Sequence, residues 1–190
     1  MKKLAIIAVL AAGLAGCAQA ARVDQMAATP TTALPATSVL QHAVQVMGVT
    51  GGTDTNPLWM SKVGNTEFQA ALSSSLGAAG MLTNGEGRYK LQAKLLQLKQ
   101  PMIGFDMAVD SQVHYTLTET GSGKAVFDRD VIASYTATVG DAFIAVKRLQ
   151  LANEGSIKKN IQQFLDEVIG ETGKGPAVSA ITLTGPGHLR

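Results

Sequence analysis

The chain has a single cysteine, a single tryptophan and few charged side chains. Charged residues make up 16% of its 190 residues, and the formal net charge is +2. No cluster of lysine and arginine is longer than two residues, which is too little positive charge for a nucleic-acid-binding surface. A lone cysteine forms no internal disulfide, and once it is modified no thiolate remains for metal binding or nucleophilic catalysis.

Motifs of common enzymes and cofactor sites are also missing. The three histidines, His42, His114 and His188, lie in unrelated contexts, so no metal-binding cluster is predicted. The chain contains no GxSxG or HExxH pattern and no GxGxxG or P-loop phosphate cradle. We therefore expect no cofactor and no metal, and the sequence names no reaction.

No hydrophobic run is long enough to span a bilayer. The longest, residues 4–14, has eleven residues and follows Lys2 and Lys3. A membrane-spanning helix needs about 20 apolar residues, whereas about 7–15 after a basic start are typical of a cleavable export signal. We therefore expect residues 1–16 to be a signal peptide.

The expected signal ends in Leu14-Ala15-Gly16-Cys17, which places the only cysteine after two small residues. Small residues let a peptidase approach the backbone, and a thiol is a strong nucleophile for forming a thioether. LAGC resembles the lipobox of bacterial lipoproteins. The alternative is a chance cysteine beside an ordinary signal cleavage site.

The resemblance implies that Cys17 carries diacylglycerol and that the signal is cut just before it. Two or three acyl chains give stable anchoring, whereas one chain gives only marginal binding. In enterobacterial lipoproteins an aspartate after the cysteine favours the inner membrane, and here Ala18 and Gln19 follow. The resemblance therefore implies an outer-membrane protein that faces the periplasm.

Residues 17–40 are rich in alanine and threonine, contain Pro30 and Pro35, and show no periodicity. This composition predicts a flexible tether between the lipid and the folded body. The alternative is an extended strand laid on the domain near residues 38–40. The folded periplasmic domain is expected over residues 41–169, and a Gly/Pro-rich tail over residues 170–190.

The folded domain alternates between strand and helix periodicity. The predicted strands lie within residues 41–49, 88–100, 104–120 and 124–140, and the predicted helices cover residues 65–79 and 141–169. The first strand has apolar residues on both faces, which predicts a central position, and the second needs a bulge at Leu95 and Leu96. The order predicts an α+β two-layer sandwich, a mainly antiparallel sheet of about four strands with two helices on one face.

One polar pair on the predicted hairpin is a candidate site. If Val113 pairs with Val131, His114 lies opposite Asp130 on the solvent face. This pair could orient an imidazole for base catalysis. No nucleophile stands beside it, and an exposed cross-strand ion pair is the simpler interpretation.

Three other features invite a ligand or a partner. Asp128 and Asp130 lie about 7 Å apart along one strand, too far to chelate an ion without further help. Arg129 could grip an anionic ligand, although a stem covered by Tyr115 explains it more simply. Trp59, in a glycine-rich loop, is the candidate partner contact, with a lid on the core as its alternative.

Over residues 41–169 the order and length of elements are similar to those of small α+β periplasmic lipoproteins of the YajG kind, and more distantly to auxiliary lipoproteins of envelope transport machines. These families imply a non-catalytic outer-membrane lipoprotein. We therefore expect a binding or envelope-assembly and transport accessory module that meets an envelope protein through a sheet edge or Trp59. The alternatives are an envelope hydrolase or transferase acting on glycan or lipid, and a lipid carrier with an apolar pocket lined by Met47, Phe105 and Tyr135.

Overall fold

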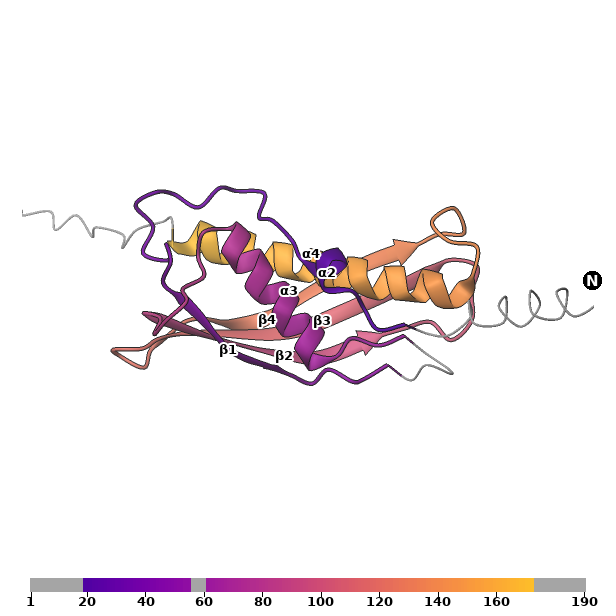
Figure 1. Ribbon diagram of the computed structural model, residues 1–190, viewed down its shortest axis with the longest axis horizontal. Coiled ribbons are helices and arrows are strands. Elements are labelled where there is room, and N and C mark those ends of the chain that lie inside the picture. Colours follow the sequence, from indigo (N-terminus) through magenta and orange to yellow (C-terminus); the bar gives the residue numbers. More distant parts are fainter. Residues whose placement is uncertain (1–18, 56–60, 173–190) are drawn as a thin grey trace, which may run out of the picture.

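A computed structural model describes residues 19–55 and 61–172 (Figure 1). The helices are α2 (Val23–Met26), α3 (Asn65–Ala78) and α4 (Ala145–Thr172), and the strands are β1 (Val44–Thr50), β2 (Tyr89–Lys99), β3 (Met107–Glu119) and β4 (Ala125–Ala137). The strands form a sheet in the order β1-β2-β3-β4, with α3 and α4 on one face. The predicted α+β two-layer sandwich is confirmed.

β3 and β4 form the hairpin that the period-two alternation predicts. Val113 pairs with Val131 and His114 with Asp130, which is the predicted register. Gly123 has a φ of 68° and closes the hairpin by donating a hydrogen bond from its amide to the carbonyl of Glu119 at 2.8 Å. The alternation sends one set of side chains into the core and leaves the other on a face of the sheet that the helices do not cover.

β1 lies at an edge of the sheet, and its predicted central position is wrong. It pairs in parallel with β2, and its register shifts between Val46 and Gly48. Val44 and Val49 are buried, whereas Met47 is exposed. A bulge moves the alternation by one residue, so a strand with one buried face carries apolar residues on both parities.

The register of β2 shifts between Leu95 and Gln97, so the predicted bulge is confirmed. At the end of α3, Gly80 has a φ of 71°, a left-handed conformation that suits glycine after a helix. Asn65 is the first residue of α3, and its Oδ1 accepts a hydrogen bond from the Gly52 amide at 2.7 Å.

α4 runs without a break from Ala145 to Thr172, beyond its predicted end at residue 169. Gly155 does not interrupt it. A Cβ there would lie 2.4 Å from the ring of Tyr135, so the glycine gives room for close packing of helix on sheet. Phe164 stacks on Tyr115 with ring centroids 4.2 Å apart and so fixes α4 on β3.

The molecule is elongated along α4, and its two ends differ (Figure 1). The described chain begins near the first turn of α4, at the end that also carries the loops of residues 100–106 and 138–144. The β3–β4 hairpin and Thr172 lie at the other end. Among the residues described, no helix combines the length and the apolar character that a bilayer crossing requires.

Candidate functional site

Two of the predicted site residues, Cys17 and Trp59, lie outside the described residues. The predicted signal peptide and residues 173–190 of the predicted tail also lie outside them. Gln19 is two residues from Cys17, and two extended residues span at most about 7 Å. The contacts of Gln19 are therefore those of the described part of the body that is nearest in sequence to Cys17.

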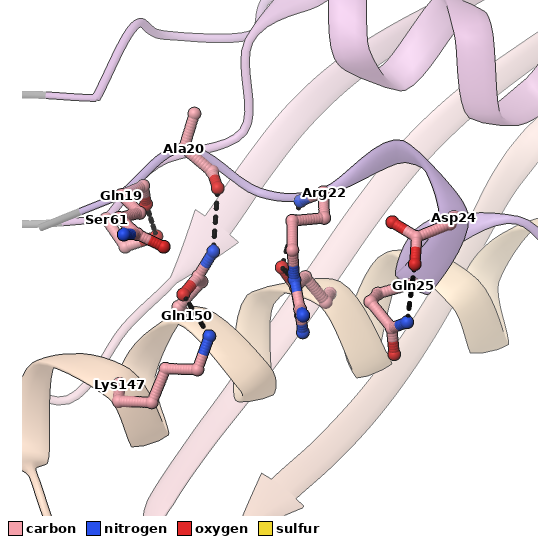
Figure 2. Close-up of polar contacts among 9 residues, drawn as sticks. Gln19, Ala20, Arg22, Asp24, Gln25, Ser61, Lys147 and Gln150 are labelled. Atoms are coloured by element: carbon pink, nitrogen blue, oxygen red, sulfur yellow. Dashed lines mark hydrogen bonds and ion pairs between the residues drawn. The ribbon is translucent and has the colours of Figure 1, made fainter.

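Residues 19–32 form a segment, here called the N-terminal strap, that is fastened to the body along its length. The Ser61 hydroxyl donates a hydrogen bond to the carbonyl of Gln19 at 2.8 Å, and the Gln150 amide donates one to the carbonyl of Ala20 at 2.8 Å (Figure 2). Ser61 and Gln150 are both buried. The backbone is thus held from the first described residue onward.

Arg22 makes the strongest polar contact of the strap. The carboxylate of Glu154 accepts hydrogen bonds from its backbone amide, Nε and Nη2. Glu154 is buried in α4, whereas the side chain of Arg22 is partly exposed. The hydrogen bond to Glu154 raises the pKa of the Arg22 guanidinium, against a smaller lowering by desolvation. A charge-assisted fork of this kind fixes both position and direction.

The strap also buries apolar side chains between the helices. Ala21, Met26 and Ala28 are buried in the core, and the Ala28 amide donates to the hydroxyl of Ser75 on α3 at 2.9 Å. Further along, the carboxylate of Asp166 on α4 accepts hydrogen bonds from two strap amides at 2.7 and 3.2 Å. The strap thus contacts both helices.

The prediction of a flexible tether over residues 17–40 is wrong for residues 19–40. Its composition lacks periodicity, but Ala21, Met26, Ala28 and Leu40 each pack into the core at a separate place, whereas Val39 stays exposed. Burial of a Met or Leu side chain is worth about 1.5–3 kcal/mol, enough to hold a segment that forms no regular helix or strand for most of its length.

The uncovered face of the sheet holds the predicted polar pair. His114 Nδ1 lies 2.7 Å from Asp130 Oδ1, and its Nε2 lies 2.9 Å from Asp128 Oδ1. Gln112 donates to the second oxygen of Asp130 at 2.7 Å, and Thr116 donates to Asp128 at 3.0 Å. Asp128 pairs with Thr116 in the sheet, and its contact with the imidazole was not predicted from the sequence.

The electrostatics of this cluster favour an imidazolium. The hydrogen bond to Asp130 raises the pKa of His114 most, with a further contribution from Asp128 and a partial opposition from desolvation. The hydrogen bond from His114 lowers the pKa of Asp130 in turn. Both ring nitrogens donate in the charged form, so neither is left to take a proton from a substrate.

Among the described residues, no nucleophile completes this cluster. Ser134 lies four residues along the strand from Asp130, and its hydroxyl donates a hydrogen bond to Asp110 at 2.6 Å. In the described parts of the chain, no three His, Cys, Asp or Glu side chains are arranged to hold a metal ion. The cluster therefore acts as a cross-strand ion pair with a second carboxylate.

A serine–lysine pair in α4 was not recognised in the sequence. Ser156 and Lys159 match the SxxK spacing of some acyl-transfer enzymes. The Ser156 hydroxyl is buried and donates to the hydroxyl of Ser111 at 2.8 Å, whereas the Lys159 ammonium lies over the ring of Tyr135. The two groups make separate contacts, and the spacing reflects helix packing.

Neither Arg129 nor the expected lipid pocket forms a ligand site. Arg129 forms ion pairs with Glu171 and Glu167 of α4 and lies over the ring of Phe127, which leaves its guanidinium engaged. The pocket expected for lipid carriage does not form from the named residues. Met47 and Phe105 are exposed at different places, and Tyr135 packs over Gly155.

No protein-family model matches this chain, and no curated protein matches it. Solved structures do share its fold. Protein XCC0632 from Xanthomonas campestris, with the family description DUF330, has a TM-score of 0.60 at 12% identity, covering 80% of this chain and 95% of that one. A Caulobacter crescentus protein named a "putative lipoprotein" has a TM-score of 0.50 at 11% identity, covering 71% and 94%.

A third structure, the hypothetical protein CT253 from Chlamydia trachomatis, has a TM-score of 0.50 at 11% identity, covering 68% of this chain and 96% of that one. Likeness at these identities shows a shared fold and does not carry over a role. The chain therefore has a fold that occurs among bacterial lipoproteins and among proteins without an assigned activity.

Proposed function

We propose that this chain is a bacterial lipoprotein, anchored by diacylglycerol on Cys17, and that it serves as a non-catalytic binding or assembly module. It faces the periplasm from the outer membrane. The lipobox resemblance of LAGC and the fold shared with the Caulobacter crescentus protein support the class. The residues after Cys17, which begin with alanine, favour the outer membrane over the inner one.

The fastening of Gln19 and Ala20 is the observation that carries the proposal. An ordinary signal peptidase would cut after small residues such as those of Ala18-Gln19-Ala20, and so remove two residues that the body holds. A cut before Cys17 keeps the whole strap. The contacts of the folded protein therefore favour cleavage before Cys17 over cleavage after Ala20.

Two features support a binding role: a polar cluster whose hydrogen bonds are satisfied internally, and a sheet edge that lies beside a groove. The His114 cluster satisfies its own hydrogen bonds, and β4 has a free outer edge within the described sheet. Between that edge and α4 lies a groove of about 580 Å³, lined in part by Ile132, Ser134 and Gln163. An extended segment of an envelope protein could add to this edge.

Mass spectrometry of the mature N-terminal peptide tests the lipid. We expect the chain to begin at Cys17 with the mass of a diacylglycerol thioether, and Cys17→Ser to keep residues 1–16. A mature chain that begins at Ala21 would overturn the proposal.

Photo-crosslinking in the native envelope tests the binding role. A crosslinker at Gln163 in the groove should capture an envelope protein, and one at Thr118 on the uncovered face serves as control. Equal capture at both positions would argue against the groove.

A further inference from the structure

One end of the molecule exposes large apolar side chains. Met102, Ile103, Phe105 and Phe143 are 85–92% exposed, although residues of these types are normally buried. They belong to two loops, and Val139 and Ile144 beside them are also exposed. We call these six residues the apolar tip. A contiguous exposed apolar patch marks a site that contacts a protein or a membrane.

The two loops of the tip lie against each other. Met107 pairs with Ala137 at the end of the β3–β4 ladder, and beyond it the Asp106 carboxylate accepts a hydrogen bond from the amide of Val139 at 3.3 Å. Phe105, next to Asp106, and Val139 therefore lie close together just beyond the paired ends of β3 and β4. The tip is one surface built from two connections.

A buried arginine holds the second loop in shape. Arg148 Nη1 donates to the carbonyls of Ala142 and Phe143 at 2.7 and 2.6 Å. Asp141 accepts from the amide and hydroxyl of Thr138 at 2.7 and 2.9 Å. The backbone that carries Phe143 is thus fixed, and its side chain stays in solvent because the body holds the loop in that conformation.

The tip adjoins the start of the N-terminal strap. Gln100, directly before the first loop, donates to the carbonyl of Ser61 at 2.9 Å, and Ser61 donates to the carbonyl of Gln19. In Figure 1 the described chain begins at the same end as both loops. Since Cys17 can lie no more than about 7 Å from Gln19, a lipid on Cys17 holds this end next to the bilayer.

We infer that the apolar tip inserts into the lipid surface that anchors Cys17, so that the body is docked end-on and does not swing on a tether. The inference rests on the proposed lipid anchor. Apolar side chains of docked proteins bury about 5–10 Å into the boundary between headgroups and acyl chains. Lys62 and Lys99, next to Ser61 and Gln100 in sequence, suit the phosphates of phospholipids.

A lipid surface fits the tip better than a protein partner. Only Ala18 separates the fastened Gln19 from the anchored cysteine, so a protein that covered the tip would have to fit between the body and the bilayer. The tip also presents the exposed side chains of methionine, isoleucine and phenylalanine from two loops, which suit an apolar lipid surface.

Fluorescence of the complete lipidated protein in vesicles of phosphatidylethanolamine and phosphatidylglycerol tests the inference. The only native cysteine is used by the lipid, so an environment-sensitive dye reacts with one introduced thiol in each variant, Ile103→Cys or Phe143→Cys. Ile132→Cys is the matched control, because Ile132 is an isoleucine 60% exposed on the uncovered face of β4. Substitution at such exposed positions leaves the core intact.

We expect the emission of dyes at residues 103 and 143 to shift to shorter wavelength and to be quenched by a quencher attached to the lipid. The dye at residue 132 should be quenched only by a water-soluble quencher. Met102→Asp with Phe143→Asp should abolish lipid quenching at residue 103 while the lipid keeps the protein on the vesicle.

Three results would overturn the inference. A lipidated protein whose dye at residue 103 behaves like that at residue 132 defeats the docking and leaves the anchor standing. A dye shielded from water yet not quenched by lipid would show that a second copy covers the tip. A mature chain without lipid on Cys17 would defeat the anchor and the docking together.

Discussion

The Glu154 carboxylate accepts hydrogen bonds from the backbone amide, Nε and Nη2 of Arg22 at 2.9, 3.1 and 3.0 Å. This fork joins the strap to the middle of α4. Arg22→Ala would leave a buried carboxylate with only the backbone donor. Since Arg22 is 42% exposed, solvent moderates the effect, and we expect a loss of about 1–2 kcal/mol in the free energy of unfolding. Urea unfolding of the purified protein measures it.

Arg88→Ala is the control for that variant. Arg88 also donates from Nε and Nη2, in this case to one oxygen of Glu119, but both side chains are accessible to water. An exposed pair contributes little, so Arg88→Ala should leave the urea midpoint nearly unchanged. Equal losses in the two variants would show that the buried position of Glu154 is irrelevant.

Gly155 and Gly170 give opposite predictions within one helix. Replacing glycine by alanine in a helix usually stabilises it by about 1 kcal/mol. At Gly155 the new Cβ would lie 2.4 Å from the Tyr135 ring, so we expect Gly155→Ala to destabilise by about 1–3 kcal/mol. Gly170→Ala meets no atom within 4 Å and should stabilise. Thermal unfolding should show a lower melting temperature for Gly155→Ala and a higher one for Gly170→Ala than for the unmodified protein.

The His114 cluster predicts a pH dependence. The pKa of the His114 ring in the folded protein is raised above its ordinary value of about 6.5. Protonated His114 therefore contributes its full stabilisation below about pH 6.5, and this contribution is lost as the pH rises through the raised pKa. The lowered pKa of Asp130 adds stability that is lost only as the pH falls through that pKa.

NMR titration of the His114 ring measures the effect directly. Asp130→Asn should lower the pKa of His114 more than Asp128→Asn does, since the bond to Asp130 is the largest cause of the shift. The reverse order, or no change in either variant, would contradict the geometry of the cluster.

Tyr115 and Asn160 form a buried polar contact between β3 and α4. The Tyr115 hydroxyl donates to Asn160 Oδ1 at 2.9 Å, and Asn160 Nδ2 donates to the carbonyl of Val131 at 2.8 Å. Burial raises the pKa of Tyr115, which keeps the phenol a neutral donor. Tyr115→Phe should cost about 1–2 kcal/mol by leaving the amide oxygen without that donor.

A double-mutant cycle of Tyr115→Phe and Asn160→Ala isolates the pair. We expect the two losses in unfolding free energy to be less than additive, because either variant alone removes the same hydrogen bond. Strictly additive losses would mean that the hydroxyl and the amide act independently.

The hairpin could be predicted from the sequence because its register has only one consistent solution. Each residue of β3 and β4 belongs to one parity, and a slip by one position would send Val113 and Val131 to the solvent. The same register placed His114 opposite Asp130. It did not reveal that the imidazole also reaches Asp128, although two aspartates on one face, two residues apart, were the signal.

The strap and β1 could not be predicted in the same way. Met26 and Ala28 are buried by helices far along the chain, and no local period records such contacts. In β1 the bulge after Val46 breaks the alternation that would have marked an edge strand with one buried face. Both failures arise where long-range packing, and not local pattern, decides the structure.

The uninterrupted length of α4 determines how far the body would extend from the membrane. Its 28 residues measure about 42 Å from end to end. With the apolar tip on the bilayer, the β3–β4 hairpin and Thr172 would stand roughly that far above the lipid headgroups. On the proposed anchor, a rigid body of this length would hold the free edge of β4 at a fixed height above the membrane, so that a partner would be selected by the height it reaches as well as by its surface.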